Sequence, residues 1–213
     1  MSYSNIIFDF DGTITDSKHD IAGAQVWVLQ QLGVTSYKPE DLFRHIGKTL
    51  EETFSTLLPP TLHERIPEAA KLYSEYYQPR SLETTTLFPG VKETLEVLRL
   101  HGKRLAIAST KRGAGIKRAT DHFGITEYFV QLQGSEGIPH KPDPTIITTI
   151  LAEQQWRREE TIMVGDTDND ILAGKNAGVA TCGVTYGSLS EDEIERFAPE
   201  FIISSFPELL SIV

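Results

Sequence analysis

The chain alternates short apolar runs with longer stretches of helical spacing. Six runs have the length and composition of buried β-strands: NIIFDF, RLAIAST, YFVQLQG, TIMVGD, ATCGVTYG and EFIISS. Helix-like segments such as PGVKETLEVLRLHG, DPTIITTILAEQQW and NDILAGKNAG lie between most of them. In the first segment Val91, Leu95 and Leu98 share one face, Pro89 stands at the start and Gly102 at the end. Alternating strands and helices predict βαβ units, and therefore an α/β fold with a mostly parallel sheet.

One section, from about residue 15 to residue 84, interrupts this alternation. Ile21, Val28, Leu29 and Leu32 form one apolar helical face that ends at Gly33. The stretches PEDLFRHIGKTLEETFSTLL and PEAAKLYSEYY also have helical patterns. A helical insertion of this size predicts a small second domain. We therefore expect residues 1–14 and 85–213 to form the α/β core, and residues 15–84 to form a separate helical domain.

Composition and net charge exclude several classes of protein. The 213 residues are 39% hydrophobic and 23% charged, as expected for a globular protein with one ordinary domain and a smaller one. A net charge of -10 argues against a nucleic-acid partner. Since no apolar run approaches membrane-spanning length, we expect no membrane partner either. The single cysteine, Cys182, excludes an intrachain disulfide, and its apolar surroundings indicate a small core residue. The start of the chain does not resemble a signal peptide, so we expect a cytoplasmic protein.

The first apolar run ends in the polar cluster Asp9-Phe10-Asp11-Gly12-Thr13. Binding sites of parallel sheets form beyond the carboxyl ends of the strands. Residues two apart in a strand point the same way, so these two carboxylates repel each other unless a cation lies between them. A hard divalent ion such as Mg²⁺, which prefers oxygen ligands, would resolve this conflict. The alternative is a solvated loop that happens to contain two acids.

Two more polar clusters follow predicted strands. Ser109, in Ser109-Thr110-Lys111, is either a helix N-cap or a hydroxyl that holds a phosphoryl oxygen together with backbone N–H groups. Lys141 lies in GIPHKPDP, which its prolines stiffen. It is either a surface lysine or a fixed positive charge for an anion or a nucleophilic carboxylate.

A fourth cluster, VGDTDND, contains Asp166, Asp168 and Asp170. Acids placed at the ends of two strands, with a lysine between them in the sequence, favour a metal site. The alternative is an N-capped helix with acids in its first turn, where they interact favourably with the helix dipole. We expect this local role to account for Asp168.

Taken in order, DFDGTITDS, AST, HKPDP and VGDTDND resemble the four motifs of the haloacid dehalogenase superfamily. The resemblance implies a Rossmann-like, three-layer core, and the helical section is similar to the small α-helical cap of that superfamily. Around the motifs, DSKHDI, LFPGV and GVTYG are similar to the phosphoglycolate phosphatase-like branch.

The resemblance also implies a Mg²⁺-dependent phosphatase that hydrolyses a small phosphorylated metabolite through an aspartyl-phosphate. Asp9 would be the nucleophile, and Asp11 the general acid and then the general base. Ser109 and Lys141 would neutralise the phosphoryl oxygens. Thr13 and Thr110 would contact the substrate. Mg²⁺ would be held by the Asp9 carboxylate, the Asp11 backbone carbonyl, Asp166 and Asp170. Thr110 stands where the branch often has Asn, so contacts to the substrate are expected to differ there.

The helical cap is the expected source of substrate choice, because the core residues reach only the phosphoryl group and the metal. In LFRHIGKTLEE, Gly47 permits a turn or a close approach, and Arg44, His45 and Lys48 cluster around it. We expect Arg44 and Lys48 to contact the substrate; the alternative is an ordinary helix end with solvated basic neighbours. His19, where the branch often has Pro, either touches the substrate or lies on the surface of the cap hinge.

Other functions stay open. Asp11 argues against a dehalogenase, because displacement of halide needs no protonated leaving group. A β-phosphoglucomutase-like phosphotransferase shares Asp9 and Asp11, but that branch has a cap-hinge histidine where this chain has Ile21. A response-regulator receiver domain is shorter and has no helical insertion, and a phosphate-binding module without catalysis is a further alternative. Phosphoglycolate, a sugar phosphate, a nucleoside monophosphate and pyrophosphate all remain candidate substrates, and the oligomeric state is open.

Overall fold

The computed structural model describes residues 3–213, which fold as two compact units. The first unit contains the residues up to Thr15 and those from Leu87 onward, and the second spans Asp16–Thr86. The chain thus leaves the first unit after its first strand and returns to it 71 residues later, as the range of the second unit shows. That the second unit acts as a cap stays a prediction.

The first unit is built on a six-stranded sheet with the order β5-β4-β1-β6-β7-β8, and every neighbouring pair is parallel. The strands are β1 (Asn5–Phe8), β4 (Arg104–Ala108), β5 (Phe129–Gln133), β6 (Thr161–Gly165), β7 (Ala180–Val184) and β8 (Phe201–Ile203). Each of the six predicted apolar runs contains one of them. The predicted α/β fold is confirmed.

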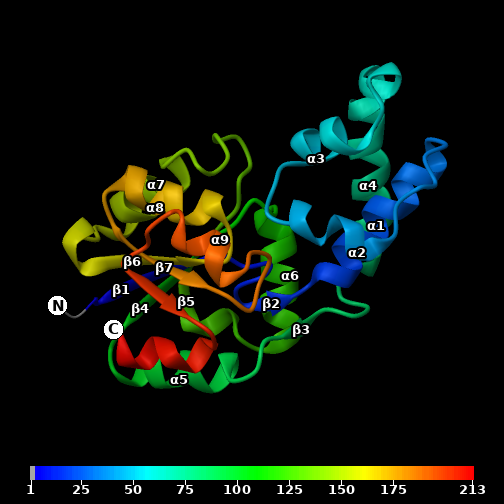
Figure 1. Cartoon of the computed structure of the whole chain (residues 1–213). Helices are drawn as coiled ribbons and strands as arrows, with labels where there is room; N and C mark the ends of the chain where they lie inside the picture. The colour runs from blue at the N-terminus through cyan, green and yellow to red at the C-terminus, as the bar shows by residue number, and fades with distance from the viewer. Residues whose placement is uncertain (1–2) are drawn as a thin grey trace. The chain divides into compact units, whose positions relative to one another are not determined.

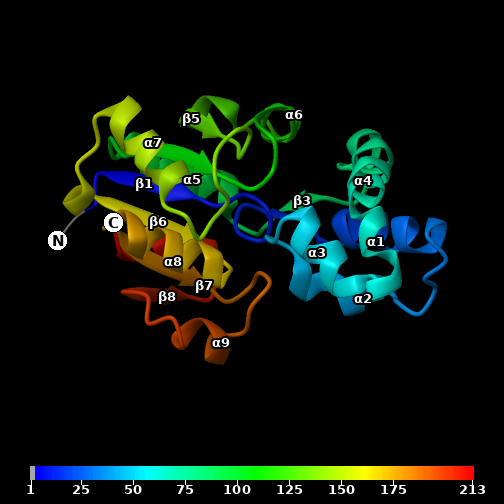
Figure 2. The same cartoon turned by 90° about the horizontal axis from the view of Figure 1, so that it is seen from above.

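Helices cover both faces of this sheet (Figure 1). Helices α7 (Thr145–Gln154) and α8 (Asp168–Ala177) lie on one face, and α5 (Val91–Leu100) lies on the other. The view from above shows α7 and α8 in front of the strands (Figure 2). Successive side chains of β1 point to opposite faces of the sheet, so the strand contributes to the helix layer on each face. Ile7 packs in a buried cluster with Ile147 of α7 and Ala173 of α8. Phe8 stacks on Phe206 of the 3₁₀ helix Phe206–Ser211, with ring centroids 5.5 Å apart.

Further elements join the strands of the first unit. Helix α6 (Gly113–Phe123) follows β4, and the short helix α9 (Glu191–Glu195) precedes β8. Short 3₁₀ turns occupy Thr126–Tyr128 and Arg158–Glu160. Cys182 is fully buried in β7, and burial raises the pKa of its thiol to about 12, as expected for a core residue. Among residues 3–213, no helix has the length and hydropathy needed to cross a membrane.

The second unit consists mainly of helices. They are α1 (Lys18–Gln31), α2 (Pro39–Leu42), α3 (Leu50–Leu57) and α4 (Ile66–Arg80), with 3₁₀ turns at Phe43–His45 and Pro60–Arg65. The predicted apolar face of α1 is buried, with Val28 and Leu29 fully enclosed. Trp27 of α1 stacks on Tyr76 of α4, with ring centroids 4.2 Å apart. The unit therefore has a hydrophobic core of its own.

The predicted helical stretch from Pro39 to Leu58 is not one helix. Ile46 has extended backbone and Gly47 has a φ of +86°, so the chain leaves helical geometry between α2 and α3. Helix α3 then starts afresh at a capping box: the Glu52 N–H donates to Thr49 Oγ1 at 3.1 Å, and the Thr49 N–H donates to Glu52 at 2.9 Å. The T-x-x-E spacing of this box is the signal in the sequence that the helical pattern concealed.

Two very short strands, β2 (Thr15–Asp16) and β3 (Thr86–Leu87), form a separate two-stranded sheet where the chain passes from one unit to the other. Within the second unit, Asp20 in the first turn of α1 accepts hydrogen bonds from the backbone N–H groups and hydroxyls of Thr84 and Thr85, at 2.6–3.1 Å. Burial raises the pKa of Asp20, but these hydrogen bonds outweigh it and hold the pKa below its ordinary value. They tie the beginning of the unit to its end.

Candidate active site

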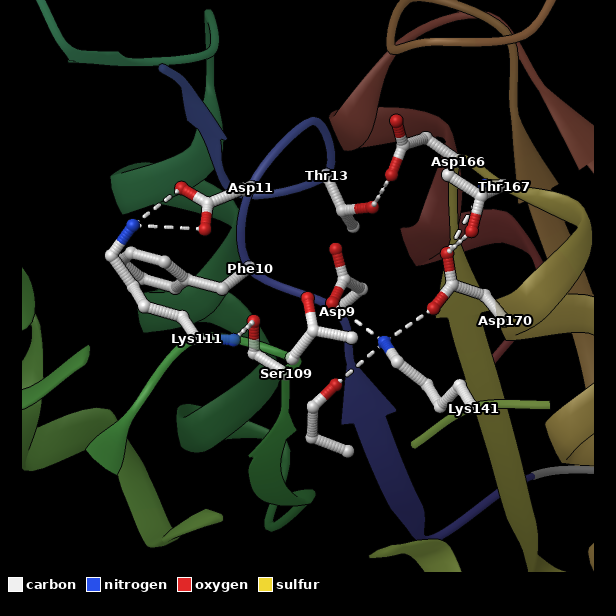
Figure 3. A network of polar contacts seen from close by, with 12 residues as sticks. Asp9, Phe10, Asp11, Thr13, Ser109, Lys111, Lys141, Asp166, Thr167 and Asp170 are labelled. Atoms are coloured by element: carbon white, nitrogen blue, oxygen red, sulfur yellow. Dashed lines mark hydrogen bonds and ion pairs between the residues drawn. The ribbon is translucent and has the colours of Figure 1, made fainter. Parts of the chain in front are cut away.

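Three of the predicted site residues follow directly on adjacent strands of the sheet. Asp9 comes after β1, Ser109 after β4 and Asp166 after β6, and β1 lies between the other two strands. The strand ladders continue into the site: the Asp9 N–H donates to the Val164 carbonyl at 2.8 Å, and the Ser109 N–H donates to the Gln133 carbonyl at 3.0 Å. The sheet therefore fixes the backbone of these residues at its carboxyl edge (Figure 3).

Lys141 reaches into this edge from the loop between β5 and α7. Its ammonium donates to Asp9 Oδ1 at 2.7 Å, to Asp170 Oδ1 at 2.5 Å and to the Ala108 carbonyl at 3.0 Å. Its side chain is only 2% exposed, so the interpretation as a surface lysine is wrong. Burial lowers the pKa of Lys141, but the charges of Asp170 and Asp9 outweigh it and raise the pKa above its ordinary value. Lys141 is thus a fixed positive charge.

Asp9, Asp166 and Asp170 form a buried acidic triad, with one carboxylate oxygen from each lying within 4.8 Å of the others. Burial raises the pKa of Asp9 well above its ordinary value; Lys141 opposes this shift, and the charges of Asp170 and Asp166 add to it. Burial, followed by the charge of Asp170, raises the pKa of Asp166 to about 6. Three carboxylates facing one ammonium leave two negative charges in excess, which a divalent cation would balance. A donor set made only of oxygen atoms suits a hard cation.

The Asp166 carboxylate is held from two sides. Thr13 Oγ1 donates to its Oδ1 at 3.2 Å, and the Ser188 N–H donates to its Oδ2 at 2.8 Å. Gly12 lies so close that a Cβ atom there would stand 2.2 Å from Asp166 Oδ2, and its φ of +93° also favours glycine. Gly12 is therefore required both by the turn and by Asp166. The Thr13 hydroxyl serves Asp166 in this structure, and its contact with a phosphoryl group stays a prediction.

Asp170 has two roles at the start of α8. Its Oδ2 accepts from the Thr167 N–H at 3.1 Å and from Thr167 Oγ1 at 2.6 Å, while its Oδ1 accepts from Lys141. Asp170 thus closes the capping box of α8, because Thr167 is the N-cap residue and Asp170 stands three positions later. Asp168 lies in the same first turn, where we expected it, and outside the triad.

Ser109 is almost fully buried beside Asp9 (Figure 3). Its Oγ accepts from the Lys111 N–H at 3.2 Å, and helix α6 begins only at Gly113 with Arg112 as its N-cap residue. The N-cap interpretation of Ser109 is therefore wrong. The Thr110 carbonyl accepts from Ser135 Oγ at 2.7 Å, which fixes this segment to the loop after β5.

Asp11 lies apart from the acidic triad and forms an ion pair that the sequence did not reveal. Lys111 Nζ donates to both of its carboxylate oxygens, at 2.9 and 3.1 Å. Figure 3 shows the Asp11 carboxylate turned toward Lys111. The two residues are 100 positions apart in the chain. A basic residue two positions after the predicted hydroxyl, Ser109, was the only signal for this contact, and it is a weak one.

The basic residues around Gly47 belong to the second unit. Arg44 and Lys48 are exposed, whereas His45 is buried and its Nδ1 has no hydrogen-bond partner within residues 3–213. Burial lowers the pKa of His45, and the charges of Lys48 and Arg44 lower it further. The ring of His19 packs edge-on against Phe43, with centroids 5.2 Å apart. Substrate contacts of Arg44 and Lys48 stay a prediction.

Comparisons with known proteins agree on one family. The family model of haloacid dehalogenase-like hydrolases matches residues 6–184. A phosphoglycolate phosphatase from Vibrio vulnificus is 34% identical over 98% of this chain and 95% of its own length. Pyrophosphatase PpaX from Halalkalibacterium halodurans is 32% identical over 100% of this chain and 98% of its own length. A solved haloacid dehalogenase-like hydrolase from Streptococcus pneumoniae superposes with a TM-score of 0.91 at 28% identity, covering 99% of this chain and 98% of its own.

Proposed function

Because this chain belongs to the haloacid dehalogenase-like hydrolases and is a phosphatase, we propose that it hydrolyses a small phosphorylated metabolite through an aspartyl-phosphate on Asp9, with Mg²⁺ as cofactor. One observation carries this proposal: Asp9 meets Lys141 in a buried ion pair at the carboxyl end of β1, beside Asp166 and Asp170. A nucleophile, a counter-charge and oxygen ligands for a divalent ion lie together there.

In the first step, a carboxylate oxygen of Asp9 attacks phosphorus. A bond forms between this oxygen and phosphorus, and the bond between phosphorus and the leaving-group oxygen breaks. Asp11 gives a proton to that oxygen, so the leaving group departs as an alcohol or its equivalent. Ser109 and Lys141, next to Asp9, bind the phosphoryl oxygens and balance their charge.

In the second step, Asp11 acts as a base. It takes a proton from a water molecule, whose oxygen attacks phosphorus while the bond from phosphorus to Asp9 breaks. Orthophosphate leaves, and the Asp9 carboxylate is restored. Asp11 regains the proton that it gave away, so both side chains return to their starting state.

The acidic triad supports a divalent ion, because its excess negative charge and its oxygen donors fit one. The Asp9 carboxylate and Asp166 would hold Mg²⁺, together with the backbone carbonyl of Asp11. Asp170 would support the metal site indirectly. Its carboxylate is already shared between Lys141 and Thr167, and it holds the lysine that pairs with Asp9. Mg²⁺, when bound, supplies positive charge to the transferring phosphoryl group.

The names of the relatives bear on the substrate. One is a phosphoglycolate phosphatase and another a pyrophosphatase, and the leaving groups of these two substrates, glycolate and orthophosphate, are both anions. We infer a small phosphoryl compound of this kind for the present chain. A phosphoglucomutase-like transfer is not favoured, because the relatives described above are hydrolases by name. A cytoplasmic location is part of the same proposal and is consistent with the single free, buried cysteine.

Release of orthophosphate from a panel of compounds tests the proposal. The panel contains 2-phosphoglycolate, pyrophosphate, a hexose phosphate and a nucleoside monophosphate, each assayed with Mg²⁺ and after chelation. We expect release that needs Mg²⁺, in wild type and not in Asp9→Asn. Equal release by Asp9→Asn, or full activity after exhaustive chelation, would contradict the proposal.

A further inference from the structure

The ion pair between Lys111 and Asp11 has no function in the mechanism above. Both side chains are 12% exposed, so the pair is screened from solvent but can still be reached. Both oxygens of the Asp11 carboxylate accept from the same ammonium, at 2.9 and 3.1 Å. In this arrangement the carboxylate faces Lys111 and not Asp9 (Figure 3).

The backbone that carries Lys111 is fixed from several sides. Its N–H donates to Ser109 Oγ at 3.2 Å, and the carbonyl before it accepts from Ser135 Oγ at 2.7 Å. The Gly113 N–H, two residues later, donates to Glu136 Oε1 at 2.7 Å. Lys111 therefore starts from a defined position, two residues from the hydroxyl that the mechanism assigns to the phosphoryl group.

The side chain of Lys111 lies along the first turn of helix α6, beside Gly115. A Cβ atom at this position would stand 3.4 Å from Lys111 Cγ and 3.6 Å from Cδ and Cε. These are ordinary van der Waals distances, so the methylene groups of Lys111 lie along the first turn of α6, and its ammonium reaches Asp11.

The position of the ammonium determines what it can touch. Asp11 must reach the leaving-group oxygen, and Lys111 Nζ lies one hydrogen bond from Asp11. Whatever part of a substrate comes near Lys111 is therefore the leaving group. A carboxylate one carbon from the ester oxygen, or a second phosphate, is the natural partner for an ammonium there. In a chain with a net charge of -10, such an anion needs a local cation.

We propose that Lys111 exchanges its contact with Asp11 for an anionic group on the leaving part of the substrate. Lys111 is thus a positioning residue for Asp11 and a specificity residue for the substrate. It holds the Asp11 carboxylate aside until an anion takes its place. Asp11, released from the ammonium, then takes up a proton from solvent and turns to the leaving-group oxygen as the acid of the first step. The exchange makes or breaks no covalent bond. It rests on the proposed function and selects phosphoryl compounds whose leaving group is itself an anion.

The test compares two substrates of similar size, 2-phosphoglycolate and 2-hydroxyethyl phosphate, whose leaving groups are an anion and a neutral diol. We expect wild type to prefer 2-phosphoglycolate. In Lys111→Met the ratio of the two kcat/KM values should fall about tenfold or more, as loss of one charge-assisted contact implies. Lys111→Arg should retain most of the ratio. Lys117→Met is the matched control, because it removes an exposed lysine that pairs with Asp121 at 2.6 Å on the same helix; it should leave the ratio unchanged.

Two outcomes would overturn the inference. One is a wild type without preference for the anionic leaving group. The other is an unchanged ratio in folded Lys111→Met, whether both kcat/KM values stay as in wild type or fall equally, as a merely structural role would cause. Circular dichroism checks folding, and Lys111→Gln replaces Lys111→Met if the latter does not fold. Failure of the proposed function is seen separately, as absence of Asp9-dependent phosphate release from every compound, and the inference would fall with it.

Discussion

Lys141 and Asp9 stand 132 residues apart in the chain, and their side chains form a buried ion pair of 2.7 Å. The same ammonium donates to Asp170 at 2.5 Å. Lys141 therefore joins the end of β1 to the start of α8. Because the desolvation of buried charges is costly, a pair of this kind persists only where its geometry is good and each partner has further hydrogen bonds.

Removal of Lys141 should destabilise the protein. Lys141→Met leaves Asp9 and Asp170 buried without their counter-charge, so we expect the free energy of unfolding without metal to fall by about 3–5 kcal/mol. Urea denaturation measures it. Lys117→Met, which breaks an exposed pair, should change stability little. Saturating Mg²⁺ should restore part of the loss, and a Lys141→Met protein as stable as wild type would contradict this account of the site.

Asp166 should make the stability of the metal-free enzyme depend on pH. Burial and the charge of Asp170 raise its pKa from 3.8 to about 6, so between these values the folded protein binds more protons than the unfolded chain. The stability that Asp166 contributes is complete below pH 4 and is lost as the pH rises through about 6, by roughly 3 kcal/mol at most.

Urea denaturation of wild type and Asp166→Asn at pH 4.5 and pH 7 isolates this contribution. Wild type should lose stability relative to the variant as the pH rises. Since a divalent ion binds the ionised carboxylate, its stabilising effect on wild type should grow over the same interval. A stability difference between the two proteins that is the same at both pH values would show that Asp166 does not titrate in this interval.

The strands and the polar residues that end them could be predicted, because both follow from local pattern. Apolar runs marked β1, β4 and β6, and the carboxyl ends of parallel strands lie at one edge, so Asp9, Ser109 and Asp166 were expected to meet. The spacing of capping residues also marked where two helices start, although the pattern of apolar residues did not show these starts. Thr49 and Glu52 form a capping box that starts α3, and the side chain at the third position after the N-cap Thr167 is the one that caps α8.

The contact between Lys111 and Asp11 could not be predicted in the same way. It depends on the path of the loop after β4, on the hydrogen bonds that fix this loop to the segment after β5, and on the packing of the Lys111 side chain along the first turn of α6. None of these follows from periodicity. A long-range contact between two side chains can be predicted only once the folded backbone is known. The residues that end parallel strands can be recognised from the apolar runs alone.

The second unit offers a separate prediction about specificity. Arg44 and Lys48 are exposed basic residues beside Gly47, and we expect them to contact the substrate. Lys48→Ala or Arg44→Ala should change the relative kcat/KM among phosphate esters several-fold, as loss of one charged contact implies. Hydrolysis of p-nitrophenyl phosphate, which does not need those contacts, should change much less. Arg65→Ala, which removes an exposed arginine paired with Glu68 in the same unit, is the control. An equal loss on every substrate, or no loss on any, would exclude this role.

Chemical trapping of the phosphoenzyme tests the central claim most directly. The enzyme is mixed with substrate, quenched within the first turnover and treated with borohydride, which reduces an aspartyl-phosphate to homoserine. Mass spectrometry of the N-terminal tryptic peptide, which contains Asp9, Asp11 and Asp16, then locates the change. The account predicts homoserine at position 9 in wild type, and neither homoserine nor phosphate release in Asp9→Asn. Homoserine at another position, or normal turnover by Asp9→Asn, would contradict it.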